Sequence, residues 1–336
     1  MGTDRIPTMV DVARLAGVGL KTVSRYVNGE QNINPELATR IAKAISDLGY
    51  RRNLAAASIR PGWTSKVLGV VVSDLGNPFF FTFARMIETA ARKRGYLVII
   101  ASSEDSGDLQ DQIIDRLLGQ RVDGLVIVPA QVGRLVLSEL RPPVPPTAVL
   151  DRPIDSDEVD TILADNYGGA FEATNVLLRN RPGRIGFLGD HLTMFTMRER
   201  HRGFVDAVAA ASETGAPVPQ MEIAVGGHAL EDSAAWATEL LERHKVNAIF
   251  AANNRAAMGA IVAFRKLGRR VPLIGFDDFE AAPLLMPAVS VVTQDESQMA
   301  SIAVDRVVDR LEGKELPHEN VTVVPTELIL RGSELP

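Results

Sequence analysis

The sequence predicts an α/β protein in which a small all-α head precedes a larger body of two α/β lobes. Three observations support this fold class. Apolar residues recur at helical spacing through the first 50 of the 336 residues. From Val67 onward, short β-branched runs alternate with helical stretches, a pattern typical of parallel sheets covered by helices on both faces. Ten such runs are too many for one compact layer, so two lobes are expected.

The head begins with two short predicted helices joined at a glycine, in the stretch DVARLAGVGLKTVSRYVNG (residues 11–29). The apolar side of the first helix is assigned to Val12, Leu15 and Ala16. Gly17 allows the tight turn that follows. Gly19 stands where a helix cap is expected, and it offers no side-chain oxygen for that purpose.

A third helix and a linker complete the N-terminal region. Asn34 is a suitable N-cap, Pro35 suits the first helical position and Gly49 suits the end of the helix. Residues 51–66 are basic, rich in alanine and then broken by Pro-Gly. This composition indicates a linker that contains one short helix.

Ten strands are expected in the body, each from a continuous apolar run. They cover residues 67–74, 96–103, 124–130, 147–153, 161–166, 184–190, 222–227, 247–254, 272–278 and 290–295. Several of these runs end in a polar residue, namely Asp74, Asp151, Asp165, Asp190, Asn253 and Asp277. Ligands of open parallel sheets bind beyond the carboxyl ends of the strands, so these side chains are expected to line a cleft between the lobes.

Charge is distributed unevenly along the chain. The formal net charge is −6. Residues 1–66 hold ten Lys and Arg against five Asp and Glu, a net +5, which leaves −11 for the remainder. A basic head on an acidic body indicates a module that binds a polyanion.

Other features exclude whole classes of protein. There is no cysteine, so disulfides and thiolate metal sites are excluded. The longest apolar runs are far shorter than the ~20 residues of a membrane-spanning helix, and the N-terminus lacks the apolar segment of a signal peptide. We find no GxSxG, P-loop, GxGxxG after a strand or HExxH motif, and the five histidines show no ligand spacing. The expectation is a cytoplasmic protein, associated with the nucleoid when bound to DNA, without enzymatic activity, metal or cofactor.

A helix over residues 20–27 would place Val23 and Val27 on one face, with Lys21 and Arg25 opposite. Arg and Lys can pair with guanine in the major groove, and Leu20 can contact a thymine methyl group. The alternative from the residues alone is a solvated basic face on an amphipathic helix.

The residues of this region resemble the DNA-binding head of the LacI family of bacterial transcription regulators. The shared positions are Thr8, Asp11-Val12-Ala13, Ala16-Gly17-Val18, Thr22-Val23-Ser24-Arg25 and Asn28, continued by NPELATRIAKAISDLGYRRN from residue 34. The resemblance then extends through essentially the whole chain. It implies a helix-turn-helix head, a hinge helix and a body like the periplasmic sugar-binding proteins.

The resemblance also implies roles in DNA binding. Leu20, Lys21 and Arg25 would read bases, whereas phosphates would be held by Thr8, Thr22, Ser24, Asn28 and Asn32. Residues 53–60 resemble the hinge helix, with Asn53 at its start and Ile59 as the apolar wedge for the minor groove. The chain departs from the family pattern at Gly19, Arg52, Ala57 and Ile59, so the hinge contacts follow less directly than those of the recognition helix.

In the body, the resemblance implies an effector site. Its predicted residues are Phe79, Phe80, Asp151, Arg200, Asn253, Asp277 and Gln294. Open alternatives are Arg198 in place of Arg200, a packed core position for Phe83, and a structural ion pair for Arg200 with Asp277. Asn254 replaces an aspartate typical of the family, and His228 is a further candidate contact. An aromatic wall with Arg, Asp and Asn suits a sugar or sugar derivative.

The predicted domains are 1–50 for the helix-turn-helix head, 51–66 for the hinge helix and linker, and 67–336 for the body that binds effector and dimerises. Within the body, one lobe comprises roughly 67–164 with 295–323, and the other 165–294 with 324–336. The resemblance implies a repressor that binds a palindromic operator on double-stranded DNA as a homodimer and is controlled allosterically by a small polar effector. The alternative is a solute-binding protein of a sugar transporter, which the lack of a signal peptide and the basic helical head disfavour.

Overall fold

The computed structural model describes residues 6–30, 32–51, 64–130, 144–154, 156, 159–213, 218–314 and 321–336. The chain forms two compact units, residues 1–65 and 66–336, which contain the head and the body. Each unit is considered by itself below. The predicted hinge helix over 53–60, with Asn53 and Ile59, lies outside the described residues.

The head is a three-helix unit whose elements are α1 (Met9–Ala16), α2 (Leu20–Val27) and α3 (Pro35–Leu48). Its core is formed by Val12, Val23 and Ile41, which are fully buried, together with Ala13, Ala16, Ala44 and Tyr50. The predicted caps are confirmed. Asn34 accepts a hydrogen bond from the backbone N–H of Glu36, and Gly17 and Gly49 end their helices in the left-handed conformation.

One predicted core position of the head is wrong. Leu15 is 54% exposed, and the adjoining side of α1 is buried through Ala13 instead. Helical spacing alone could not separate these two positions. Leu15 lies three residues after Val12, and Ala13 lies three residues before Ala16, so both fit the spacing of a buried face. Gly19 begins α2 without a side-chain cap, as expected from its lack of a side-chain oxygen.

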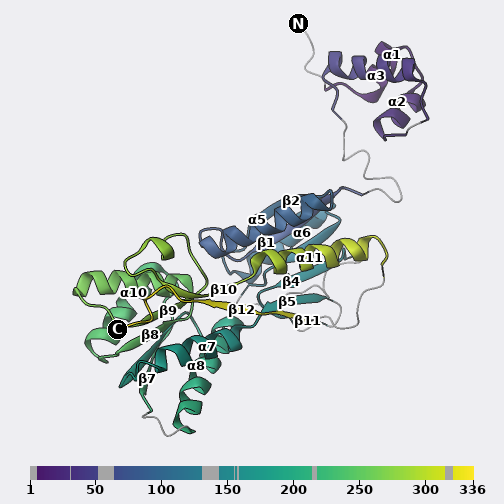
Figure 1. Cartoon of the computed structure of the whole chain (residues 1–336). Coiled ribbons are helices and arrows are strands. Elements are labelled where there is room, and N and C mark those ends of the chain that lie inside the picture. The colour runs from purple at the N-terminus through teal and green to yellow at the C-terminus, as the bar shows by residue number, and fades with distance from the viewer. Residues whose placement is uncertain are drawn as a thin grey trace. The chain divides into compact units, whose positions relative to one another are not determined.

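The body contains two six-stranded sheets, which lie side by side with helices over their faces (Figure 1). Lobe 1 is built on the strand order β11-β5-β4-β3-β1-β2, and all of its pairings are parallel. Its strands are β1 (Val67–Val72), β2 (Leu97–Ser102), β3 (Gly124–Ile127), β4 (Thr147–Leu150), β5 (Asp160–Ala164) and β11 (Val321–Val324).

Lobe 2 repeats this arrangement with the order β12-β10-β9-β8-β6-β7. Its strands are β6 (Arg184–Leu188), β7 (Gln220–Ala224), β8 (Ala248–Ala251), β9 (Leu273–Phe276), β10 (Ser290–Gln294) and β12 (Thr326–Ile329). β12 pairs antiparallel with β10, whereas the other pairings are parallel. The ten predicted runs correspond to β1–β10, but β11 and β12 were not predicted.

Helices cover both faces of each sheet, as the apolar strands require. In lobe 1, α5 (Pro78–Lys93) and α11 (Glu296–Leu311) share one core with the sheet, and α6 (Gly107–Gly119) packs in a second core on it. In lobe 2, α9 (Leu230–Glu242) and α10 (Asn254–Leu267) form one core, and α7 (Asn166–Leu178) and α8 (Phe195–Glu213) form the other. A short 3₁₀ helix, η2 (Ala282–Leu284), follows β9.

The chain passes between the lobes three times within the described part of the body. It leaves β5 for α7, leaves β10 for α11, and passes directly from β11 to β12 (Figure 1). The chain therefore passes from one lobe to the other near residues 165, 295 and 325. Three short crossings that are close together allow the lobes to change their relative angle without repacking either core.

A close helix contact in lobe 2 gives a test of the packing. A Cβ added at Gly203 in α8 would collide with the carbonyl oxygen of Tyr167 and lie 3.0 Å from the backbone nitrogen of Phe171 in α7. We expect Gly203→Ala to lower the free energy of unfolding by about 1–3 kcal/mol, because backbone atoms cannot give way as a flexible side chain can. Urea denaturation of the purified protein measures this change.

Gly119 provides the matched control, because a Cβ there would meet no atom within 4 Å. Gly119→Ala at the end of α6 should leave stability unchanged or raise it by roughly 0.5–1 kcal/mol. Equal effects of the two substitutions would contradict the close packing of α7 on α8.

Candidate functional site

A cavity lies between the two lobes, beyond the carboxyl ends of their strands. Its empty volume is about 470 Å³, part of which is open to solvent. Lobe 1 contributes Asp74, Asn77, Phe79, Phe80, Asp105, Asp151 and Arg152. Lobe 2 contributes Asp190, Met194, Thr196, Met197, Arg200, His228, Asn253, Arg255 and Asp277. This is the position at which open α/β sheets bind ligands.

Arg200 and Asp277 form a buried ion pair on the lobe 2 side of this cavity. Arg200 extends from α8, and Asp277 follows the end of β9 in a left-handed conformation. The Arg200 Nη1 atom lies 3.0 Å from Asp277 Oδ2, and Nη2 lies 3.3 Å from Oδ1. Arg200 is only 2% exposed. Such a two-point pair is planar and fixed, which suits the recognition of neighbouring hydroxyl groups.

Neighbouring groups hold this pair in place. Arg200 donates from Nε to Asn166 Oδ1 at 2.7 Å and from Nη1 to the carbonyl of Ala252 at 2.7 Å. Its guanidinium lies 3.7 Å from the centre of the Phe276 ring. Gln294 donates from Nε2 to Asp277 Oδ1 at 2.6 Å. These contacts leave the guanidinium a single orientation.

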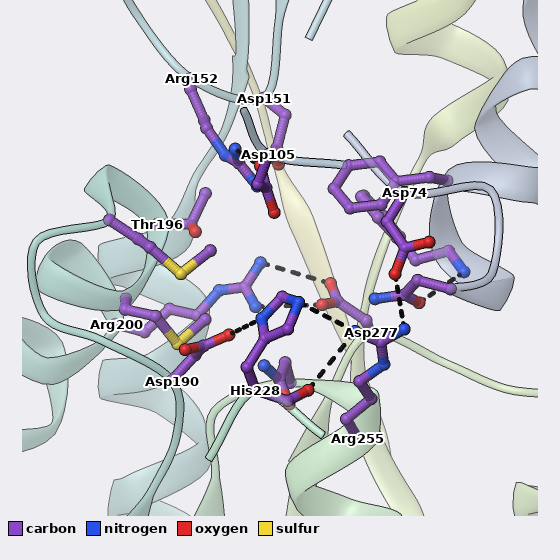
Figure 2. A pocket seen from close by; sticks show the side chains of 16 residues that line it. Asp74, Asp105, Asp151, Arg152, Asp190, Thr196, Arg200, His228, Arg255 and Asp277 are labelled. Atoms are coloured by element: carbon purple, nitrogen blue, oxygen red, sulfur yellow. Dashed lines mark hydrogen bonds and ion pairs between the residues drawn. The ribbon is translucent and has the colours of Figure 1, made fainter. Parts of the chain in front are cut away.

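The lobe 1 side of the cavity brings an aromatic pair together with charged groups. Phe79 and Phe80 begin α5 and meet edge to face with ring centres 5.1 Å apart. Arg152 donates from Nη1 to Asp105 Oδ1 at 2.6 Å and to the carbonyl of Pro129 at 2.9 Å. Figure 2 shows Arg152, Asp151 and Asp105 gathered on the side of the cavity opposite Arg200.

Two contacts join the lobes across the mouth of the cavity. Arg255 of lobe 2 donates from Nη2 to Asp74 Oδ2 of lobe 1 at 2.6 Å, as Figure 2 shows by a dashed line. Asn254 donates from Nδ2 to Asn77 Oδ1 at 2.8 Å. Asn254 therefore takes part in an interlobe contact at the position where the family typically has an aspartate. Opening of the cavity requires both contacts to break.

His228 and Asp190 form a further pair on the lobe 2 side. His228 Nδ1 lies 2.7 Å from Asp190 Oδ2. This hydrogen bond raises the pKa of His228 above its usual value, although burial acts in the opposite direction. Burial raises the pKa of Asp190, but hydrogen bonds from His228 and from the backbone of His191 outweigh it and lower the pKa. His228 thus lines the cavity, as suggested by the sequence.

The structure brings together most of the residues predicted for the effector site. Phe79, Phe80, Asp151, Arg200, Asn253 and Asp277 all line this cavity. Gln294 does not line it, and it contacts the cavity only through its hydrogen bond to Asp277. Asn253 also caps α10, since its Oδ1 accepts from the N–H of Ala256.

The structure also shows where the other residues considered for this site lie. Arg198 has a 59% exposed side chain and lies near Glu199, so it does not replace Arg200. Phe83 is fully buried in the core of lobe 1. Asp165 does not line the cavity, and instead its side chain caps α7 by accepting from the N–H of Gly168. Strand ends can serve as helix caps, which sequence position alone does not distinguish from a ligand site.

Sequence reasoning missed two arginines of the cavity. Arg152 follows Asp151 directly, and Arg255 lies two residues after Asn253. Their closeness to predicted polar strand ends was the available signal. Neither partner, Asp105 nor Asp74, could be paired with its arginine from the sequence, because the partners are 47 and 181 residues away along the chain.

The surface of α2 in the head carries the residues predicted to read DNA. Leu20 and Lys21 are exposed, whereas Thr22, Ser24 and Arg25 are partly buried. Arg25 Nε lies 2.6 Å from Glu30 Oε2, and its Nη2 donates to the carbonyl of Asn32 at 3.1 Å. The contact with Glu30 uses only Nε, so the Nη atoms can contact a base without breaking it.

The residues predicted to hold phosphates take different positions in the head. Thr8 begins α1, and its backbone N–H and hydroxyl both donate to Asp11 Oδ2, at 2.9 and 2.6 Å. Asn28 ends α2, and both Asn28 and Asn32 are exposed. The phosphate contacts themselves stay predictions.

A titratable group lies at the crossing from β10 to α11. Burial raises the pKa of Glu296 to about 7, and the nearby carboxylates of Asp277, Asp295 and Asp278 raise it too, against a lowering contribution from its own backbone N–H. At pH values between 4.5 and about 7, the folded protein holds a proton on Glu296 that the unfolded chain has released. The free energy of unfolding therefore falls as the pH rises through this range.

We expect Glu296→Gln to remove this pH dependence. The variant should match the wild type near pH 4.5 and exceed it by roughly 2 kcal/mol at pH 8, since an amide never ionises. Urea denaturation at several pH values between 4.5 and 8 measures the difference. A constant difference between the two proteins across that range would contradict the raised pKa.

Two negative observations apply to the residues that the structure describes. Among them, no helix is long and apolar enough to cross a membrane. The same residues contain no group of three or more His, Cys, Asp or Glu side chains placed to hold a metal ion.

The three-helix head and the two-lobed body with its cavity define a DNA-binding regulator with a ligand-binding domain. Residues 8–53 match the family model of bacterial regulatory proteins of the lacI family. Residues 65–307 match the model of periplasmic binding proteins and the sugar binding domain of the LacI family. The chain therefore belongs to the LacI family, whose members regulate transcription and are not enzymes.

Full-length relatives agree with this assignment. Catabolite control protein A of Priestia megaterium is 29% identical over 334 residues, covering 97% of this chain and 98% of the relative. The HTH-type transcriptional repressor PurR of Photobacterium profundum is 29% identical over 333 residues, covering 97% and 98%.

Solved structures share the fold. The complex of the transcriptional regulator CelR with cellobiose is 29% identical, with a TM-score of 0.69, over 97% of this chain and 99% of that chain. The lac repressor dimer bound to operator and the anti-inducer ONPF is 22% identical, with a TM-score of 0.84, over 99% and 100%. The latter likeness shows the common fold of head and body.

Proposed function

We propose that this regulator is a repressor that binds a palindromic operator as a homodimer and responds to a sugar or sugar derivative in the interlobe cavity. The observation that carries the effector assignment is the buried Arg200–Asp277 pair, which faces a cavity with aromatic side chains on its other side. A guanidinium and a carboxylate together hold vicinal hydroxyls, and aromatic rings stack on the apolar face of a sugar ring.

The proposal for DNA binding rests on α2. Lys21 and Leu20 are exposed on one surface while Val23 anchors the helix in the core, so the helix can present these side chains to a major groove. Leu20, Lys21 and Arg25 are proposed to read bases. Thr22, Ser24, Asn28 and Asn32 are proposed to hold phosphates, with Thr8 at the start of α1.

A homodimer follows from the operator symmetry, and the surface of the body supports it. Large apolar side chains are exposed on the edge strand β2, at the start of α5 and after η2, where Met286 is 99% exposed. The other members of this set are Phe81, Leu97, Ile99 and Leu284. A second copy of the chain would remove these side chains from water.

A thermal-shift screen against neutral sugars, amino sugars and sugar phosphates tests the effector proposal. A ligand of the native state raises the unfolding temperature by mass action. At least one compound is expected to do so in the wild type and to lose its effect in Arg200→Ala. A screen in which no sugar or sugar derivative shifts the transition at millimolar concentration would contradict the proposal.

The alternative of a transport solute-binding protein is not supported. Such a protein needs only the two-lobed body, whereas residues 8–53 match the regulatory DNA-binding module. A selection of DNA sites from random duplexes by the purified protein distinguishes the two. Recovery of a palindromic site whose affinity falls steeply with salt is expected of the regulator.

A further inference from the structure

Asp151 is a buried carboxylate with an unused acceptor. It follows the end of β4 in a left-handed conformation, with φ of 67°, and is 3% exposed. Its Oδ1 atom has no hydrogen-bond partner in the described part of the chain. Burial raises the pKa of Asp151, and nearby Arg152 and Arg200 lower it only in part. A carboxyl group in this state costs stability unless a ligand completes its bonding.

The adjoining Arg152 has an unused donor. Its Nε atom is buried without a hydrogen-bond partner among the described residues, and it lies 3.5 Å from Asp151 Oδ2, too far for a good hydrogen bond. An acceptor and a donor are therefore both left open on residues that line the cavity. One hydroxyl group could satisfy both, because it donates and accepts at the same time.

Carboxyl groups outnumber arginines among the residues that line the cavity. Each arginine that lines it is already paired with a carboxylate, and His228 is paired as well. The pairs are Arg255 with Asp74 at 2.6 Å, Arg152 with Asp105 at 2.6 Å, His228 with Asp190 at 2.7 Å and Arg200 with Asp277 at 3.0 Å. Asp151 is the additional carboxylate. An anionic ligand would have to displace a carboxylate from one of these arginines and still face the remainder.

Two of the three helices that begin at the cavity in the described part of the body have capped N-termini. Those of α5 and α10 begin at Asn77 and Asn253, whose side-chain oxygens already accept from the N–H groups of Phe79 and Ala256. Asp74 likewise accepts from the N–H of Gly76 at 2.7 Å. Phosphate sites depend on open N–H groups and unpaired cations, and at α5 and α10 side-chain oxygens already accept from one N–H group each. The first turn of α8 also lines the cavity, through Thr196 and Met197, so it is the paired cations and the carboxyl groups that disfavour an anion.

We propose that the effector carries no anionic group and places a hydroxyl or amino donor on Asp151 Oδ1. Its class is a neutral sugar or an amino sugar, and sugar phosphates and sugar acids are rejected. This inference rests on the proposed sugar response of the same cavity. It adds that the effector has no anionic group and that Asp151 accepts a hydrogen bond from it.

The first experiment compares matched sets of probes by calorimetry. Each set contains a parent sugar, its phosphate ester and its amino derivative, for example glucose, glucose 6-phosphate and 2-amino-2-deoxyglucose. In the set that binds, the parent or the amino sugar is expected to bind at least tenfold more tightly than the phosphate ester. Tighter binding of a phosphate ester would overturn this inference but leave the proposed sugar response intact. Binding of no member of any set would overturn both.

The second experiment uses the unliganded protein, so it does not depend on the probe. Asp151→Asn removes a buried charge that lacks a full set of partners, and Asn tolerates the left-handed conformation. We expect the variant to unfold about 2–4 °C higher than the wild type at pH 8. It should also bind the best neutral probe at least tenfold more weakly, because the carboxylate acceptor is lost.

Asp105→Asn is the matched control. It changes the other carboxylate beside Arg152, but this one is bonded to the arginine at 2.6 Å. Its loss removes the hydrogen-bonded charge partner of the buried guanidinium and leaves only Asp151 at 3.5 Å, so the unfolding temperature should fall. If Asp151→Asn lowers the unfolding temperature as Asp105→Asn does, Asp151 is a structural group and the inference is wrong.

Discussion

Arg200→Ala is expected to destabilise the body by about 3–5 kcal/mol and to abolish its response to the effector. The substitution leaves the Asp277 carboxylate, which is 5% exposed, in the interior with only the Gln294 amide as a hydrogen-bond donor from the original set. An unpaired buried charge has a cost of this size. The contacts of Arg200 with Asn166 and Ala252 are lost at the same time. Urea denaturation measures the stability, and calorimetry measures ligand binding.

Two variants separate loss of binding from loss of folding. In Arg200→Met with Asp277→Asn both charges of the pair are removed, and Asn tolerates the left-handed conformation of residue 277, so stability should largely return while ligand binding stays absent. Arg198→Ala removes an exposed arginine from the same helix and should change stability by less than about 0.5 kcal/mol. Ligand binding by the double variant would show that the ion pair is structural only.

Arg25→Ala is expected to weaken binding to the selected operator by about 1–3 kcal/mol, which is roughly 5- to 150-fold, and to relax the choice of base at one position of each half-site. The reason is the planar guanidinium of Arg25, which can form two hydrogen bonds with guanine. Lys21→Ala should have a similar effect at a different base. Competition binding with single-base variants of the operator measures the specificity.

The control for these variants is Lys43→Ala on α3. Lys43 is exposed and paired with Asp47 at 2.7 Å, and it is not among the proposed base-reading residues. Its loss should lower affinity for operator and random duplex by similar factors, as expected for a general electrostatic contribution. The proposed role of Arg25 would be rejected if its removal also affected both duplexes equally.

The periodic parts of this fold could be predicted from the sequence. Continuous apolar runs marked the inner strands, because strands buried on both faces need apolar residues at every position, whereas β2 and β7 are edge strands with exposed positions. Five of the six polar strand ends named from the sequence line the cavity, since parallel strands place their carboxyl ends at one edge. Asp151, Arg200 and Asp277 were predicted in this way or through the family resemblance, and the structure places them together.

The missed parts depend on contacts that are distant in sequence. β11 and β12 are four residues each, separated by Pro325, and their outward side chains are largely exposed, so neither forms a continuous apolar run. Arg152 meets Asp105 only when β2 and β4 are assembled in the sheet of lobe 1, and Arg255 meets Asp74 only when the two lobes face each other. The prediction for Leu15 was wrong because helical spacing does not fix whether Ala13 or Leu15 faces the core of the head.

The central claim is that ligand in the body changes the affinity of the head for DNA. The most direct measurement is the Kd for the selected operator at fixed salt, with and without a saturating concentration of the sugar found in the screen. We predict a change of roughly 5- to 150-fold in the wild type, the usual range for such coupling, and no change in the variant with Arg200→Met and Asp277→Asn. An identical wild-type Kd in both conditions, with the ligand shown to be bound, would contradict the account.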